Sequence, residues 1–363
     1  MKKNKNYVDL KDQPVPEGQH LLEVDDLKMY FHTEDGVVRA VDGVSYTLDR
    51  GETLGVVGES GSGKSVTAMT IMGLISMPPG KIEGGDVRYR GRSILEMTEE
   101  EMQHIRGNDI AMIFQDPMTS LNPVYKIGKQ VGEGLRLHRG YSKQEALKRA
   151  TELLDLVCIP QPEKRVNEYP HQFSGGMRQR VMIAMALACD PDILIADEPT
   201  TALDVTIQAQ IIELMQEMQE KNGNAIIMIT HDLGVVADMA DKIMVMYAGR
   251  PVEFGTAEEI FYESRHPYTW GLIRSIPEQA IDEKKPLTPI HGNPPSLMNL
   301  PEGCVFSPRC PYATDKCRKQ RPERVVTESG HYSACHYSGD PEFLKNAPET
   351  SRTRKDSKKG GEA

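Results

Sequence analysis

A glycine-rich loop between an apolar strand and a helix constrains this 363-residue chain more than any other feature. The loop fits the pattern G-x-x-x-x-G-K-[ST] and reads Gly58-Glu59-Ser60-Gly61-Ser62-Gly63-Lys64-Ser65. In such a loop, backbone N–H groups wrap a β-phosphate, and the start of the helix adds partial positive charge. We predict that Lys64 reaches the β- and γ-phosphates of a nucleotide and that the Ser65 hydroxyl binds Mg²⁺. A glycine-rich turn can match the pattern by chance, and a true match still leaves many families of nucleotide hydrolases open.

Short apolar runs alternate with amphipathic stretches along most of the chain. The runs that predict buried strands are Thr53–Val57, Ile110–Phe114, Ile193–Ala196, Ala225–Thr230 and Ile243–Tyr247. The stretches that predict helices are residues 64–75, 143–157, 177–189 and 205–221. Asp204 is expected to cap the last of these helices, and Ala248-Gly249 is expected to form a turn. The alternation predicts an α/β domain with a largely parallel sheet.

Composition restricts the partners and the location of the chain. The formal net charge is -10, which disfavours nucleic acid as a partner because phosphate backbones attract basic surfaces. The longest unbroken apolar stretch, Val181–Cys189, is too short to cross a bilayer. No apolar segment follows the basic start, so we expect no secretory signal. A cytoplasmic protein is therefore expected, held at a membrane only through another chain.

Two carboxylates stand at the end of one predicted strand. The run Ile193–Ala196 leads directly into Asp197 and Glu198. Beside a phosphate-binding loop, Asp197 is expected to hold Mg²⁺, directly or through water, and Glu198 is expected to polarise the attacking water as general base. The alternative is a buried strand whose exposed end happens to be acidic.

A serine-glycine-glycine sequence precedes another predicted helix, for which Ser174 suits the N-cap. The segment reads Phe173-Ser174-Gly175-Gly176-Met177-Arg178-Gln179-Arg180. It resembles the signature motif of ABC ATPases, in which these residues bind the γ-phosphate of ATP held by the opposite subunit. The resemblance makes Ser174, Gly175 and Gly176 nucleotide-binding residues. Met177 stands where the family more often has glutamine, a departure that resembles the peptide-importer branch. In isolation, Ser-Gly-Gly is usually a plain helix start.

Four further positions match the ABC ATPases in family order. Gln115 resembles the Q-loop glutamine, which senses Mg²⁺ and water and links to the membrane subunits, and His231 resembles the switch histidine at the γ-phosphate. Ala202-Leu203-Asp204 resembles the D-loop, and Phe31 stands where the family places an aromatic side chain that stacks on adenine. A lone strand-end histidine is more often a surface or core residue, and a lone phenylalanine is usually core. As an ordered set, these matches extend the resemblance over about residues 21–260.

The last part of the chain resembles one subfamily, the ATPases of oligopeptide, dipeptide and some nickel importers. The matching segments are Asp116-Pro117-Met118-Thr119-Ser120-Leu121-Asn122-Pro123, His266-Pro267-Tyr268-Thr269, Gly292-Asn293-Pro294-Pro295-Ser296, Leu300-Pro301-Glu302-Gly303-Cys304, Arg309-Cys310-Pro311 and Cys335-His336. The expected function is therefore ATP hydrolysis that powers oligopeptide uptake.

The resemblance implies an architecture as well. We expect a RecA-like core with an inserted helical subdomain at about residues 116–190, within an ATP-binding domain over 21–262. A flexible arm over 1–20 precedes this domain. An irregular importer extension over 263–337 and a disordered tail over 338–363 follow it.

The same resemblance implies partners. We expect a second, homologous ATPase as heterodimer partner, two integral membrane permeases and, indirectly, an extracytoplasmic peptide-binding protein. The chain would then be a peripheral protein at the cytoplasmic face of the cell membrane.

Four cysteines gather in the last sixth of the chain with the spacing C-x5-C-x6-C-x17-C, and they are Cys304, Cys310, Cys317 and Cys335. Four thiolates match the ligand count of a [4Fe–4S] cluster, and the resembled subfamily has members with such a cluster at these cysteines. Zinc is the main competitor, although no close C-x₂₋₄-C pair occurs. Reduced cysteines or disulfides are a third reading, and His331 or His336 could replace a thiolate. We predict the iron–sulfur cluster, in a structural or regulatory role.

Other functions stay open at this point. A soluble ABC ATPase of DNA repair or translation usually carries coiled-coil insertions or tandem ATPase domains, whereas this sequence has one phosphate-binding loop and no heptad run. A structural subunit with a dead site is disfavoured by the intact Lys64, Asp197 and Glu198. Dipeptide or nickel import remains an alternative, because an ATPase of this kind never touches the cargo.

Overall fold

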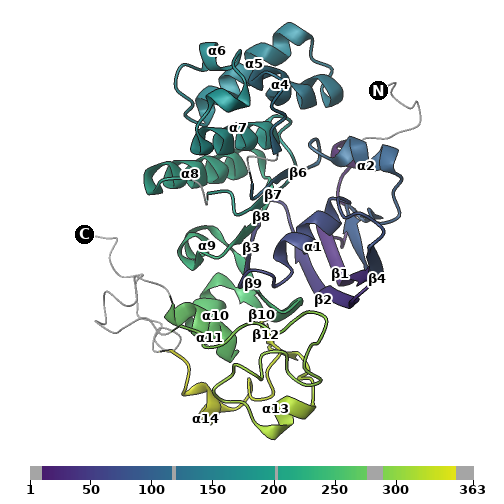
Figure 1. The fold of residues 1–363 in the computed structure, drawn as a ribbon, viewed down its shortest axis with the longest axis vertical. Coiled ribbons are helices and arrows are strands. Elements are labelled where there is room, and N and C mark those ends of the chain that lie inside the picture. The colour runs from purple at the N-terminus through teal and green to yellow at the C-terminus, as the bar shows by residue number, and fades with distance from the viewer. Residues whose placement is uncertain (1–9, 117–119, 201–202, 276–288, 349–363) are drawn as a thin grey trace.

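The computed structural model describes residues 10–116, 120–200, 203–275 and 289–348. It contains two sheets and a helical layer (Figure 1). The larger sheet has the strand order β11 (Val325–Val326), β12 (Tyr332–Ser333), β10 (Arg250–Thr256), β9 (Lys242–Tyr247), β3 (Thr53–Val57), β8 (Ala225–Thr230), β7 (Ile193–Asp197) and β6 (Ile110–Ile113). The smaller sheet has the order β2 (Gly36–Leu48), β1 (Leu22–Thr33), β4 (Gly80–Tyr89) and β5 (Arg92–Ser93).

The helices follow these strands along the chain. Before residue 240 they are α1 (Lys64–Ile71), α2 (Glu99–Ile105), α4 (Ile127–His138), α5 (Lys143–Leu156), α6 (Pro162–Arg165), α7 (Gly175–Leu187), α8 (Val205–Asn222) and α9 (Leu233–Met239). After it they are α10 (Ala257–Tyr262), α11 (Pro267–Arg274), α13 (Asp315–Lys319) and α14 (Pro341–Leu344). Two short 3₁₀ turns are η1 (Leu10–Asp12) and η2 (Pro170–Gln172). In the described part of the chain, none of these helices combines the length and apolarity needed to span a bilayer.

The centre of the larger sheet is parallel, which confirms the predicted α/β class. Strands β9, β3, β8, β7 and β6 pair in parallel with one another in this order. Every residue of β3, β7 and β8 is buried, as expected for apolar strands covered on both faces. Each predicted strand occurs with its ends shifted by no more than one residue. Because parallel strands end at the same edge of a sheet, the segments after β3, β6, β7 and β8 are brought together.

The predicted helices also occur, with larger shifts at their ends. Helix α7 begins at Gly175, two residues earlier than expected, because Ser174 caps it. Helix α1 ends at Ile71, four residues before the predicted end. Gly73, with a φ of +60°, follows and takes a backbone conformation that cannot continue a helix.

The smaller sheet packs against α1 around the first hydrophobic core. Strands β1 and β2 form a long antiparallel pair, and β4 joins β1 on its other side. Leu10, from the described part of the predicted arm, is 5% exposed and joins this core. The sheet lies beside α1 in Figure 1, so it supports the loop that leads into this helix.

A helical lobe lies at the opposite end of the molecule from α13 and α14 (Figure 1). Its helices α4, α5 and α7 bury their apolar faces in a second core, which also contacts β6, β7 and β8. The Ser142 hydroxyl and the Glu145 carboxylate form a capping box that fixes the start of α5. The predicted helical subdomain falls in this region, and its proposed limits remain a prediction.

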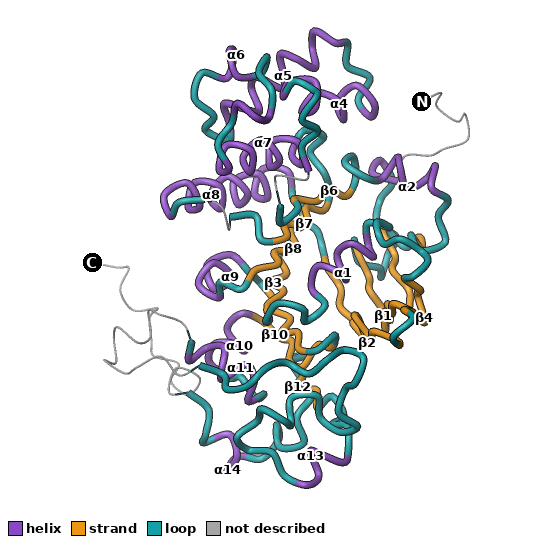
Figure 2. Tube along the Cα trace, viewed as in Figure 1, coloured by secondary structure: helices purple, strands orange, loops and turns teal. Residues whose placement is uncertain are grey.

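The described part of the chain after α11, residues 289–348, is mostly loop, with the short helices α13 and α14 (Figure 2). It is joined to the larger sheet through β12, which pairs antiparallel with β10. The structure differs from the expected disordered tail over residues 338–348, where α14 forms. The Phe343 ring there lies 5.3 Å from Trp270 and 5.5 Å from Tyr312, measured between ring centroids, and this contact orders the segment.

A buried histidine at the start of α11 makes stability depend on pH. His266 is 1% exposed and its Nδ1 accepts the Tyr268 N–H at 3.1 Å. Burial lowers its pKa from 6.5 to about 3, so between these values the unfolded chain binds a proton that the folded chain does not. We therefore expect this contribution to stability to be complete above pH 6.5 and to fall by about 1.4 kcal/mol per pH unit below it.

Thermal unfolding of the wild type and of His266→Asn between pH 7 and pH 4 measures this contribution. The asparagine can keep the cap but does not titrate, so its unfolding temperature should fall less steeply on acidification. His291→Asn changes an exposed histidine and serves as the control. Parallel slopes for wild type and His266→Asn would show that the titrating group lies elsewhere.

Candidate active site

The glycine-rich loop joins β3 to α1 at the edge where the parallel strands end. Gly58 and Gly63 have φ angles of +151° and +101°, which favour glycine. A Cβ at Gly58 would lie 2.2 Å from the Met246 carbonyl oxygen, and one at Gly63 would lie 2.3 Å from the Ala40 carbonyl oxygen. The loop is thus pressed between β9 and β2. Its Ser62 hydroxyl is buried and has no hydrogen-bond partner within the described residues.

Lys64 opens α1 with its ammonium group turned back into the loop. Its side-chain Nζ donates to the carbonyl oxygens of Gly58 at 2.7 Å and Glu59 at 3.1 Å. Burial lowers the pKa of Lys64, while the carboxylates of Glu198, Asp197 and Glu59 act in the opposite direction. The loop therefore presents a buried cation surrounded by backbone groups, an arrangement that suits phosphate.

Asp197 and Ser65 form a pair of oxygen donors beside Lys64. Asp197 ends β7 and is 2% exposed, and burial raises its pKa although a hydrogen bond from Ser65 lowers it. One carboxylate oxygen of Asp197, Oδ1, is buried without a hydrogen-bond partner among the described residues. An unpartnered buried carboxylate oxygen next to a hydroxyl fits a hard divalent cation such as Mg²⁺.

Glu198 stands between two residues from neighbouring strands. Its Oε2 accepts a hydrogen bond from Gln115 Nε2 at 3.0 Å, and its Oε1 lies 3.4 Å from His231 Nδ1. Gln115, Glu198 and His231 follow β6, β7 and β8, which are adjacent in the sheet. Glu198 has a φ of +48°, and its N–H donates to the Ile229 carbonyl at 2.8 Å. A carboxylate held in a strained backbone conformation between two polar side chains is typical of a functional position.

The serine-glycine-glycine segment forms the start of helix α7. Ser174 caps α7 by accepting the Met177 N–H at 3.3 Å. Ser174 and Gly175 are exposed, and a Cβ added at Gly175 would meet nothing within 4 Å. The start of α7 therefore offers open backbone N–H groups to a ligand that approaches from outside the chain.

The remaining predicted residues have local roles in this structure. Asp204 caps α8, where its Oδ1 accepts the Ile207 N–H at 3.0 Å. Ala202 lies outside the described residues, whereas Leu203 packs against the second core. Phe31 lies on β1, is partly buried and packs against the first core, as the alternative reading expected. Its contact with adenine and the role of Asp204 at a nucleotide remain predictions.

Sequence reasoning missed three residues that hold the site in place. Gln179 donates to the Pro199 carbonyl at 2.8 Å and so connects α7 to the segment after Glu198. Tyr268 and Arg309 both contact Glu59 in the phosphate-binding loop. All three lie in segments that resemble the importer ATPases, but the pattern of residue types says nothing about these contacts.

The predicted iron–sulfur cluster is a wrong prediction. All four cysteines are free and line one small pocket, yet no group of three or more His, Cys, Asp or Glu side chains in the described residues is arranged to hold a metal ion. Burial raises the pKa of the Cys304 thiol, and raises that of Cys310 to about 11 and that of Cys335 to about 12. Burial thus penalises the charged thiolate form at these three positions.

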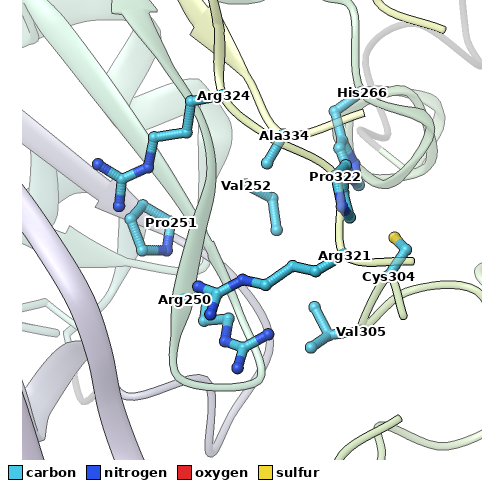
Figure 3. Close-up of a pocket in the computed structure, with 10 residues that line it drawn as sticks. All are labelled: Arg250, Pro251, Val252, His266, Cys304, Val305, Arg321, Pro322, Arg324 and Ala334. Atoms are coloured by element: carbon cyan, nitrogen blue, oxygen red, sulfur yellow. The ribbon is translucent and has the colours of Figure 1, made fainter. Parts of the chain in front are cut away.

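The zinc alternative fails because the described residues contain no arrangement that could hold a metal ion, and the histidines do not replace a thiolate. His331 Nε2 lies 3.1 Å from a carboxylate oxygen of the buried Glu253, and His336 Nε2 lies 2.9 Å from the Gln320 carbonyl oxygen. Cys304 and Cys310 pack instead against a third hydrophobic core, which includes Tyr247, Tyr268 and Phe306. Cys304 also lines a neighbouring pocket of about 40 Å³ with Arg321 (Figure 3), where Arg250 forms an ion pair at 2.6 Å with Asp42.

Comparison with known proteins covers both parts of the chain. The family model described as "ABC transporter" matches residues 41–201, and the one described as "Oligopeptide/dipeptide transporter, C-terminal region" matches residues 252–317. The second match begins within β10 and continues through Cys317, so it includes Tyr268 and Arg309.

Individual proteins and structures are similar over most of their length. The oligopeptide transport ATP-binding protein OppD of Bacillus subtilis strain 168 is 58% identical over 312 residues, which cover 86% of this chain and 87% of that protein. The dipeptide transport ATP-binding protein DppD of Escherichia coli K12 is 52% identical over 320 residues, which cover 88% of this chain and 97% of that protein. A dimeric post-hydrolysis structure of the ATP-binding cassette MJ0796 with ADP and Pi has a TM-score of 0.60 and 28% identity, and the match covers 65% of this chain and 98% of that chain.

Proposed function

The chain belongs to the ABC transporter family, in its oligopeptide and dipeptide transport branch, and we propose that it hydrolyses ATP to power the uptake of oligopeptides. One observation carries the proposal. The carboxylate of Glu198 is held between Gln115 and His231 at the same sheet edge as the phosphate-binding loop. This arrangement supports hydrolysis, because it sets a base beside the groups that suit phosphate.

The loop binds and orients the triphosphate of ATP. Lys64 exchanges its bonds to the Gly58 and Glu59 carbonyls for bonds to the β- and γ-phosphate oxygens. The unpartnered Ser62 hydroxyl gains a phosphate oxygen as hydrogen-bond acceptor. Asp197 and Ser65 are the residues that would hold Mg²⁺, which neutralises negative charge on the phosphates when it is bound.

Glu198 is the general base. Its carboxylate accepts a proton from the water that attacks the γ-phosphate. Gln115 and His231 contact the two carboxylate oxygens from opposite sides and so fix the orientation of Glu198. His231 is 66% exposed in its side chain, which leaves it free to turn towards the γ-phosphate.

A second subunit completes the site. Ser174 and Gly175 are exposed at the start of α7, where Ser174 caps the helix, and Gly176 follows them. We infer that they bind the γ-phosphate of ATP held by a homologous ATPase, in a heterodimer. ATP closes the pair and hydrolysis opens it, a population shift driven by the difference in nucleotide affinity between the two states.

The complete importer would contain two integral membrane permeases and an extracytoplasmic peptide-binding protein. The chain itself would be peripheral, at the cytoplasmic face of the membrane, with Gln115 near the contact to the permeases. Opening and closing of the ATPase pair would then move the permeases between inward- and outward-facing states.

The need for a second subunit predicts that the ATPase rate of this chain depends on its partner. The isolated chain should hydrolyse ATP slowly, and addition of the partner ATPase within the purified complex should raise turnover per active site, because the start of α7 then reaches a bound nucleotide. Steady-state phosphate release at several protein concentrations, together with sedimentation, measures this. Full turnover from a demonstrated monomer would contradict the two-subunit site.

Cargo needs a separate measurement, since this chain does not contact the peptide. The alternative is dipeptide import, which the 52% identity to a dipeptide transport protein supports, or nickel import. The reassembled complex in vesicles should take up labelled peptides of four to six residues in an ATP-dependent manner. Uptake restricted to two-residue peptides, or to nickel, would replace the oligopeptide assignment and leave the ATPase assignment intact.

A further inference from the structure

The segment that follows the ATPase domain reaches into the phosphate-binding loop. The guanidinium of Arg309 makes a two-pronged ion pair with Glu59, with Nη1–Oε2 at 2.5 Å and Nη2–Oε1 at 2.9 Å. The Arg309 side chain is 4% exposed and that of Glu59 is 29% exposed. The two residues lie 250 positions apart in the chain. A partly buried, bidentate pair of this kind is more directional than an exposed ion pair, and its charge-assisted hydrogen bonds are stronger.

Arg309 is itself held rigidly. Its Nε donates to the His291 carbonyl at 3.0 Å, and its Nη2 donates to the Ile290 carbonyl at 3.1 Å. Its Nη1 lies 3.4 Å from the Tyr247 hydroxyl at the end of β9. The pair with Glu59 is the main reason that the pKa of Arg309 is raised, so the side chain remains a cation. These hydrogen bonds hold the guanidinium in place, so it cannot move with Glu59 if Glu59 changes its position.

Tyr268 fixes the backbone of the same loop residue. Its hydroxyl accepts the Glu59 N–H at 2.9 Å. The Tyr268 ring is fully buried and lies 4.7 Å from Tyr247 and 5.3 Å from Phe306, measured between ring centroids. The Glu59 carbonyl accepts from Lys64, so every polar group of Glu59 has a partner, and two of these partners come from outside the ATPase core.

These contacts matter because Glu59 is a carboxylate in a loop suited to phosphate. A carboxylate released towards the loop would repel a triphosphate and would compete for Lys64, whose pKa already responds to Glu59. We propose that Arg309 is a positioning residue of the nucleotide site: it draws Glu59 away from the phosphates and neutralises its charge. The affinity for ATP therefore depends on the carboxy-terminal segment, an inference that rests on the proposed function and deepens it.

Removal of Arg309 tests the proposal. In the full-length chain within its complex, Arg309→Gln leaves Glu59 unpaired in the loop. The KM for ATP and the Kd for a fluorescent ATP analogue should rise on the order of tenfold, with kcat within about twofold of the wild type. The matched control is Arg321→Gln. This exposed arginine of the same segment lines the pocket in Figure 3, whose lining contains no residue of the phosphate-binding loop, and its change should leave KM unaltered.

A double variant distinguishes a role of Arg309 in ATP binding from a role in fold stability alone. Glu59→Gln removes the repelling charge, so the double variant Glu59→Gln/Arg309→Gln should recover most of the lost ATP affinity. A pair that only stabilises the fold predicts a lower unfolding temperature in both single variants and no such recovery. An unchanged KM in Arg309→Gln, or a double variant as weak as Arg309→Gln, would overturn the proposal. ATP hydrolysis by the wild-type complex is measured alongside the variants. That measurement tests the proposed ATPase function, whereas the variants test only the role of Arg309.

Discussion

Glu198→Gln is expected to bind ATP with near wild-type affinity and to hydrolyse it roughly 10²- to 10⁴-fold more slowly. The amide keeps the size of the side chain and can still accept the hydrogen bond from Gln115, but it cannot take a proton from the attacking water. Because hydrolysis opens the ATPase pair, the variant should accumulate as a closed, ATP-containing dimer. Single-turnover phosphate release and size-exclusion chromatography with ATP measure the two effects.

A matched control variant shows whether the loss of any negative charge lowers the rate of hydrolysis. Glu100→Gln makes the same chemical change on the exposed surface of α2 and should behave like the wild type. Wild-type turnover in Glu198→Gln would place the general base at another residue, and a loss of ATP binding would mean that the carboxylate supports the loop rather than the chemistry.

Lys64→Ala is expected to reduce kcat by roughly 10²- to 10³-fold and to weaken ATP binding sharply. Lys64 is the buried cation of the loop, and its removal takes away the side-chain cation expected at the β- and γ-phosphates, near the carboxylates of Asp197 and Glu198. Binding of a fluorescent ATP analogue and steady-state phosphate release measure the loss.

Lys148→Ala provides the control for this variant, because Lys148 is exposed on α5. It should leave both measurements at the wild-type level. Retained ATP binding and turnover in Lys64→Ala would contradict the assignment of the glycine-rich loop as the phosphate site, whatever the outcome for Glu198.

The parallel sheet and the cluster of groups at its edge could be predicted because their signals are local. Apolar runs such as Ala225–Thr230 bury completely and read as strands, and the residue after each run must then lie at the shared edge. Gln115, Glu198 and His231 therefore meet although they are distant in sequence. Phe31 shows the limit of such reasoning, because an aromatic residue on a strand suits a core and a ligand equally well.

The carboxy-terminal segment could not be predicted in the same way. It has little periodicity, and its position depends on contacts such as Tyr268 to Glu59, which spans 209 residues. The cysteine spacing was misleading because the number of cysteines says nothing about how the fold arranges them. Burial raises the pKa of the Cys335 thiol to about 12, an effect that depends on the folded environment and not on the order of residues.

The pairing of β12 with β10 has a consequence for any attempt to isolate the ATPase domain. A chain cut after α10 would uncover the edge of the seven-residue strand β10 at Glu253 and Phe254, which now pair with β12. Such edges recruit strands from other molecules. In the full chain the outermost strand of this side is β11, only two residues long and too short to serve as a template. The shortened protein should therefore self-associate during expression more than the intact chain does, because it lacks residues that cover this edge and lie far from the catalytic groups.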